Sequence, residues 1–167
     1  VMQLHIGTYL DANTSHVKSV GQSTGFDCCD DAAPVKGVGE LLNNLTTIGE
    51  LPKTIIYPLD GTKIETWAIL AAGFCDNGTK AKVQLGAPWW FNDQAFGIQR
   101  QFEAFANLYP VSLSVGMLTD SRSFISYPRH ELYRRVLCSY LGSLVERGEY
   151  FSGVEEVTET IENVCFN

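Results

Sequence analysis

Four short apolar runs alternate with helical patterns along this chain, and the alternation limits its fold more than any other feature. The runs that read as strands are Val1 to Gly7, Thr54 to Leu59, Ala81 to Gly86 and Val111 to Leu118. The second run is continuous rather than alternating, which is typical of a strand covered on both faces. Strands that alternate with helices predict an α/β fold with a parallel sheet.

Helical periodicity follows each run. The predicted helices are Val35 to Ile48, Ile64 to Phe74, Asp93 to Leu108 and His130 to Arg147, with a last one from about Val154 to Val164. Three-and-four spacing marks one buried face of the first helix, at Val38, Leu41, Leu42 and Leu45. The residues expected to line the inner face of the third helix are Phe96, Phe102, Phe105 and Ala106.

These elements make four strand-helix units and a terminal helix, with no linker or low-complexity segment between them. Residues 1–167 therefore read as a single unit. Four such units are half of an eight-stranded (β/α)8 barrel of the TIM type. Four parallel strands can also form a small, open, doubly wound sheet, so the periodicity leaves both architectures open.

Composition excludes several classes of protein. The net charge of −7 argues against a nucleic-acid surface, and no apolar run approaches the roughly 20 residues of a membrane helix. The N-terminal residues lack the pattern of a signal peptide. The five cysteines are odd in number and none forms a C-x-x-C pair. Reduced thiols in a cytoplasmic protein are the simplest interpretation.

The segment Gly116 to Tyr127 carries the strongest chemical signal. Asp120 and Arg122 stand two residues apart, directly after the last apolar run. Because the active sites of parallel α/β sheets lie at the carboxyl ends of their strands, these residues are candidates for a catalytic base and an anion clamp. The alternative is structural: Asp120 caps a following turn and Arg122 is solvated.

Two other apolar runs also end in unusual motifs. The first closes with Gln3-Leu-His5-Ile-Gly7, and the third with Gly86-Ala-Pro-Trp89-Trp90-Phe-Asn-Asp93. Together with Gly25-Phe-Asp27, Glu50 to Thr54 and Tyr127 to Glu131, these motifs resemble, in order, the C-terminal part of the uronate isomerases (glucuronate isomerase). The resemblance runs over essentially the whole chain.

The resemblance implies a distorted (β/α)8 barrel of the amidohydrolase type, of which this chain is the C-terminal half, strands five to eight with their helices. The chain would then be a fragment of a longer protein and need its N-terminal half as a partner. It also implies an aldose-ketose isomerase acting on hexuronates, D-glucuronate to D-fructuronate and D-galacturonate to D-tagaturonate, by proton transfer through an enediol.

Roles for individual residues follow from the same resemblance. Asp120 is implied to be the base and to lie at a divalent metal, and Arg122 to place positive charge beside the developing oxyanion. His5 is implied to sit in the metal and substrate pocket. An imidazole and a carboxylate suit zinc or manganese, and zinc is the expected metal. For His5 the structural alternative is a core histidine.

Three further residues are candidates for substrate binding. Trp89 and Trp90 are expected there, although adjacent strand residues point to opposite faces, so at most one should meet the sugar ring. The alternative for both is packing. Asp27 lies in the matched Gly-Phe-Asp segment on the catalytic side, and its alternative is a solvated loop residue.

The chain departs from the family pattern in two places. The family's metal-binding His-x-His pair belongs to the half that is not in this sequence. The loop after His-Ile-Gly carries arginines in the family, where this chain has Leu10 and Ser15. Recognition of the uronate carboxylate is therefore open. A non-catalytic sugar-acid-binding relative and an independent α/β interaction domain remain alternatives.

The open strand edges of half a barrel predict self-association. In half a barrel, the runs Val1 to Gly7 and Val111 to Leu118 would each have an unpaired edge, which favours self-association. We expect the chain alone to be dimeric or larger, and inactive.

Overall fold

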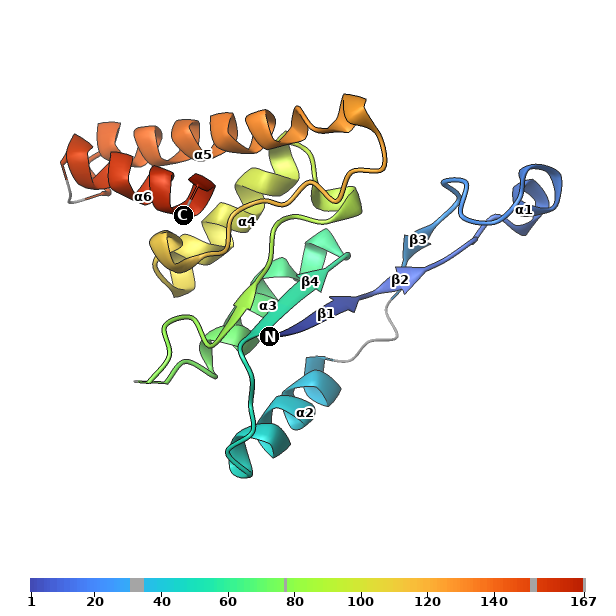
Figure 1. Cartoon of the computed structure of the whole chain (residues 1–167), viewed down its shortest axis with the longest axis horizontal. Helices are drawn as coiled ribbons and strands as arrows, with labels where there is room; N and C mark the ends of the chain where they lie inside the picture. Colours follow the sequence, from blue (N-terminus) through green and yellow to red (C-terminus); the bar gives the residue numbers. More distant parts are fainter. Residues whose placement is uncertain (31–34, 77, 151–152, 167) are drawn as a thin grey trace.

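The computed structural model describes residues 1–30, 35–76, 78–150 and 153–166. Its main sheet has three parallel strands in the order β1-β4-β5. They are β1 (Met2–Ile6), β4 (Thr54–Pro58) and β5 (Val83–Leu85), and Figure 1 shows them side by side. The parallel sheet with intervening helices confirms the predicted α/β class.

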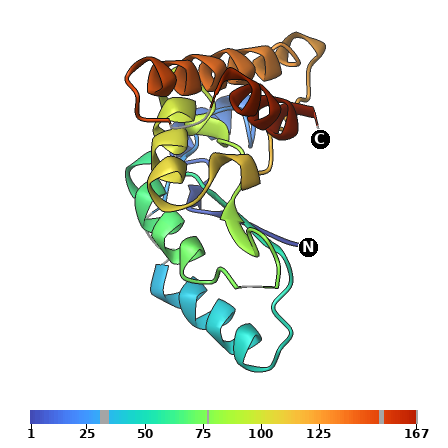
Figure 2. The same ribbon diagram turned by 90° about the vertical axis from the view of Figure 1, so that its left-hand side faces the viewer.

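Five helices follow the predicted ranges closely. They are α2 (Val35–Thr47), α3 (Ile64–Ala72), α4 (Ala95–Leu108), α5 (Arg129–Glu146) and α6 (Val154–Phe166). Each packs against the next, from α2 through α6 (Figure 2). Single 3-10 turns connect the elements at η1 (Gly61–Lys63), η2 (Trp90–Asn92), η3 (Val111–Leu113) and η4 (Phe124–Ser126).

The core lies between one face of the sheet and these helices. Ile56 and Leu85 are paired neighbours on adjacent strands and are fully buried. Along β1, Met2, Leu4 and Ile6 pack against this core, whereas the residues between them are exposed. This alternation leaves the opposite face of β1 free to carry polar side chains.

The strand predicted over Val111 to Leu118 is wrong. The run starts as the turn η3, and no strand follows it in the described residues before α5. The Val115 N–H donates to the Gln84 side-chain oxygen (2.8 Å) instead of joining a backbone ladder. A Cβ on Gly116 would lie 1.9 Å from the Val164 carbonyl oxygen, so α6 packs directly on this segment. Apolar composition alone does not make a strand, because a strand needs a paired neighbour.

Two predicted inner faces also need correction. Phe96 is 79% exposed and Leu41 43% exposed; Ala106 is exposed as well. In α4 the buried stripe contains Ile98, Phe102 and Phe105. At about 100° per residue, Phe96 lies on the opposite side of the helix from Ile98.

One part of the fold was not predicted. Strands β2 (Thr8–Tyr9) and β3 (Cys28–Cys29) pair antiparallel, and α1 (Thr14–Val20) lies between them in sequence. Figure 1 shows this arm extending from the end of β1, away from the helices. Strands of two residues are too short to show a period.

None of the described helices is long and apolar enough to cross a membrane. All five cysteines carry free thiols.

Gly86 is required by the packing of Tyr57, because a Cβ at Gly86 would lie 2.0 Å from the Tyr57 ring. We expect Gly86→Ala to lower the free energy of unfolding by about 1–3 kcal/mol, since the ring must move. The matched control is Gly142→Ala in α5, where a Cβ meets nothing within 4 Å. That change should raise stability by about 0.5–1 kcal/mol. Urea denaturation measures both, and equal effects would contradict the packing argument.

Candidate active site

A cavity of about 670 Å³ opens at the carboxyl ends of the strands. We call it the cleft; it is bounded by the ends of β1 and β4, the loop 87–90, the segment 118–122 and the arm. All six residues singled out in the sequence line it: His5, Asp27, Trp89, Trp90, Asp120 and Arg122. Carboxyl ends of parallel strands are the usual place for a binding site in α/β proteins.

His5 points from β1 into the cleft and is held by aromatic rings. The parallel register sets His5 opposite Tyr57, and their rings stack at 4.6 Å between centroids with an angle of 7°. The Trp89 ring meets His5 edge-on at 4.7 Å. Burial raises the pKa of Tyr57, so its hydroxyl stays protonated. Tyr57 was not predicted as a cleft residue, because strand register is not visible in the sequence.

Trp89 and Trp90 both line the cleft, and the premise that they are adjacent residues of a strand is wrong. The pair stands in a turn and not in a strand: Trp89 is extended, whereas Trp90 has a φ of 43°. A bulky residue in the left-handed region is strained, and such strain gathers at functional sites. The buried Asn92 holds the turn in place by donating to the Leu59 carbonyl at 2.9 Å.

Asp120 and Arg122 are both exposed at the cleft. Within the described part of the chain, neither side chain has a hydrogen-bond or ion-pair partner. Asp120 has a φ of 45°, a conformation that Asp adopts more readily than most residues. The following turn η4 is capped by Ser123 and not by Asp120. The carboxylate and the guanidinium are therefore both available to a ligand.

Asp27 borders the cleft and also holds the arm together. Its Oδ1 accepts from the Asp11 N–H at 2.8 Å, and Asp11 in turn accepts from the Ser23 N–H at 3.0 Å. Leu10 is part of the same loop and lines the cleft, whereas Ser15 belongs to α1 and does not. Of the two replaced loop positions, only Leu10 thus lies at the cleft.

Arg129 and Asp93 also line the cleft and were not singled out in the sequence. They form an ion pair between Arg129 Nη1 and Asp93 Oδ2. Only 4% of the Asp93 side chain is exposed. Burial raises the pKa of the Asp93 carboxyl, while the Arg129 charge holds it down. In the sequence, Arg129 belongs to the motif Tyr127 to Glu131 that contributes to the family resemblance, but no role was predicted for it.

His5 and Asp120 are the only expected metal ligands at the cleft. In the residues that the structure describes, no group of three or more His, Cys, Asp or Glu side chains could hold a metal ion. Zinc sites use at least three protein ligands, so the donors of this chain do not fit such a site by themselves.

Comparison with known proteins gives the family. The model of the family described as glucuronate isomerase matches residues 1–167. A uronate isomerase from Clostridium perfringens is 43% identical over 166 residues, which are 99% of this chain and 36% of that protein. One from Marinomonas sp. is 45% identical over 165 residues, 99% of this chain and 35% of the relative.

Solved structures agree. The uronate isomerase from Thermotoga maritima matches with a TM-score of 0.85 and 34% identity over 98% of this chain and 34% of its own. The glucuronate isomerase from Caulobacter crescentus also has a TM-score of 0.85, with 29% identity over 100% of this chain and 33% of its own. The chain spans about a third of the length of these relatives. Over its whole length, the chain belongs to the glucuronate isomerase family.

Proposed function

We propose that this chain is the C-terminal part of a uronate isomerase, in which it forms half of a (β/α)8 barrel. The parallel order β1-β4-β5, with helices packed against one another in sequence order, supports this proposal, since a barrel sector has the same arrangement. The chain's share of its relatives, about a third, leaves room for the other strands.

The proposed reaction is an aldose-ketose isomerisation of a hexuronate such as D-glucuronate or D-galacturonate. The observation that carries it is that Asp120 and Arg122 both lie at the cleft and that neither side chain has a partner among the described residues. Asp120 takes the proton from the carbon beside the carbonyl, which gives an enediol, and returns it to the former carbonyl carbon. The hydroxyl on the deprotonated carbon loses its proton to the original carbonyl oxygen, so that the first becomes the new carbonyl and the second a hydroxyl. Arg122 stabilises the negative charge that develops on these oxygens.

The aromatic residues supply the walls. Trp89 and Trp90 have ring centroids 4.9 Å apart and offer apolar faces to the carbons of a sugar. His5 is held by Tyr57 and Trp89 and can donate or accept a hydrogen bond at the sugar oxygens. We also propose that zinc binds at the cleft. His5 and Asp120 would supply two of its ligands, and the N-terminal half would supply the others. The free thiols are consistent with a cytosolic enzyme.

Assembly is part of the same proposal. The strand β1 is an edge of the sheet in the described residues. An open edge invites another strand, either from the N-terminal half or from a second copy of the chain. We therefore expect this chain by itself to associate, and to lack isomerase activity because half of the cleft is missing.

A chimera tests the function. This chain would replace the matching segment of the Clostridium perfringens uronate isomerase, and turnover of D-glucuronate and D-galacturonate would be measured. We expect activity from the chimera, and none from this chain or from the truncated relative alone. A folded chimera that binds hexuronate without turnover would favour the non-catalytic relative instead. A folded chimera that does not bind hexuronate would favour the interaction domain.

A further inference from the structure

One arginine joins two segments that border the cleft to the turn before α5. Arg129 opens α5, and its guanidinium makes four hydrogen bonds. Nη1 donates to Asp93 Oδ2 in the loop after the tryptophans. Nη2 donates to the Thr119 carbonyl and to Ser121 Oγ (3.2 Å), the two neighbours of Asp120 in sequence. Nε donates to the Ser126 carbonyl at 3.3 Å, within the turn before α5.

This arrangement uses nearly all of the donors of Arg129 inside the protein. A guanidinium has five N–H groups, and the Asp93 carboxylate balances its charge. Arg129 is therefore occupied, in contrast to Arg122, which has no partner in the described part of the chain. The two arginines of the cleft thus have different roles: Arg122 is free for a ligand, and Arg129 holds the protein.

The ion pair between Arg129 and Asp93 is not explained by a contribution to folding stability alone. The Asp93 side chain is only 4% exposed, whereas that of Arg129 is 34% exposed, and among the described residues Asp93 Oδ1 is the one buried side-chain nitrogen or oxygen without a hydrogen-bond partner. Removing a carboxylate from water costs free energy that an ion pair offsets poorly, and the unpaired oxygen of Asp93 adds to that cost. Such a pair is better explained by what it positions.

We propose that Arg129 is a positioning residue that, with Asp93 as its anchor, holds the Thr119 carbonyl and the Ser121 hydroxyl on either side of Asp120 and thereby aims the carboxylate at the substrate. The proposal rests on the proposed function, in which Asp120 is the base. A planar guanidinium suits this task because Nη2 alone reaches the acceptors on both sides of Asp120, while Nη1 holds Asp93 in the same rigid plane. An ammonium group cannot reproduce that geometry, so Arg129→Lys keeps the charge and loses the planar donors.

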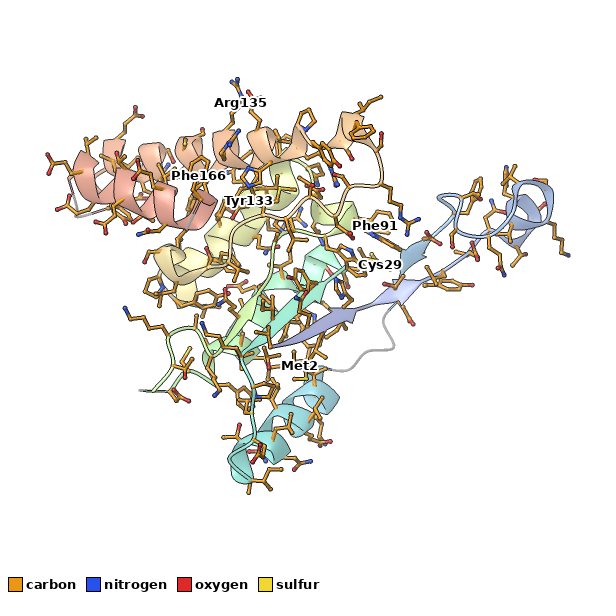
Figure 3. The ribbon with its side chains drawn as sticks, in the orientation of Figure 1. Met2, Cys29, Phe91, Tyr133, Arg135 and Phe166 are labelled. Carbon is orange, nitrogen blue, oxygen red and sulfur yellow. The ribbon has the colours of Figure 1, made fainter. Side chains whose placement is uncertain are left out.

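The test uses the chimera with Arg129→Lys, with Arg129→Ala, and with Arg135→Lys as the matched control. Arg135 lies on the same helix and points away from the molecule, as Figure 3 shows. Among the residues with described positions, it pairs with exposed Glu131 alone. Three readouts are needed: kcat and KM for the hexuronate, amide hydrogen exchange of residues 118–122, and recovery of activity when guanidinium is added to the Ala variant.

We expect Arg129→Lys to lower kcat on the order of a hundredfold with little change in KM, the effect of a base that is misplaced by about 1 Å. Exchange at residues 118–122 should become faster while α4 and α5 stay protected. Guanidinium should restore part of the kcat lost by Arg129→Ala. Arg135→Lys should match the parent in every readout.

Other results would overturn the positioning role. Unchanged kcat and exchange in Arg129→Lys would remove it, and exchange that rises throughout the chain would show a structural role only. If Arg129→Ala does not fold, Arg129→Lys decides alone. If the parent chimera has no isomerase activity, the proposed function has failed, and the exchange at residues 118–122 in Arg129→Lys still decides the positioning.

Discussion

Asp120→Asn should lower the kcat of hexuronate isomerisation by about a hundredfold to ten-thousandfold, the range expected when a general base is lost. The amide keeps the shape of the carboxylate but cannot take up the proton. Asn also tolerates the left-handed backbone found here, where φ is 45°. Because Asp120 is exposed and unpartnered in the described residues, stability should stay within about 0.5 kcal/mol.

The measurement is turnover of D-glucuronate in the chimera, together with its thermal unfolding midpoint. Asp76→Asn is the matched control, because Asp76 is an exposed carboxylate in the loop before β5 and lies outside the cleft. Exchange of the substrate's C2 hydrogen with solvent should disappear in Asp120→Asn and persist in the control. Near-normal turnover of Asp120→Asn would rule out Asp120 as the base.

Arg122→Ala should lower kcat by about a hundredfold to a thousandfold, the loss that follows removal of one donor to a developing oxyanion. Arg122→Lys should recover part of it, since the charge remains while the planar fork is lost. Both variants should fold normally because Arg122 is exposed. Steady-state kinetics of the chimera distinguish an arginine that stabilises the developing oxyanion, which affects kcat, from one that only binds the substrate, which affects KM.

The outcome that would reassign Arg122 is a rise in KM with kcat unchanged. Such a result means equal binding of substrate and transition state, as expected of a group that grips the uronate carboxylate. Arg147→Ala is the control, because Arg147 pairs with Glu149 beyond the end of α5 and lies outside the cleft. It should change neither constant.

The helices could be predicted because each one depends on residues close in sequence. Apolar spacing located α2 through α6 to within a few residues. The same local signal located β1, β4 and β5. It failed for Val111 to Leu118, where an apolar run follows Pro110, makes a turn and then packs under α6. Whether such a run pairs as a strand depends on a neighbour that the sequence of the run does not contain.

Several residues that line the cleft could be predicted from the sequence, but the contacts between them could not. Motifs of adjacent residues pointed to His5, Asp120 and Arg122, which the fold brings to one cavity. They could not show that Tyr57 stacks on His5, since this contact depends on the register of two parallel strands. Nor could they show that Trp90 turns into the cleft, because its positive φ is set by the turn that Asn92 anchors.

By itself, the sequence determined the family, the α/β class and the residues that meet at the cleft, because contiguous motifs and helical periodicity are local properties. Only the tertiary structure decided the number of paired strands in the described chain and the pairing of Arg129 with Asp93. These two residues stand 36 positions apart, and their ion pair exists only once α5 packs beside the loop after β5. Contacts of this kind depend on where the fold places distant segments, and no local pattern of residues records that placement.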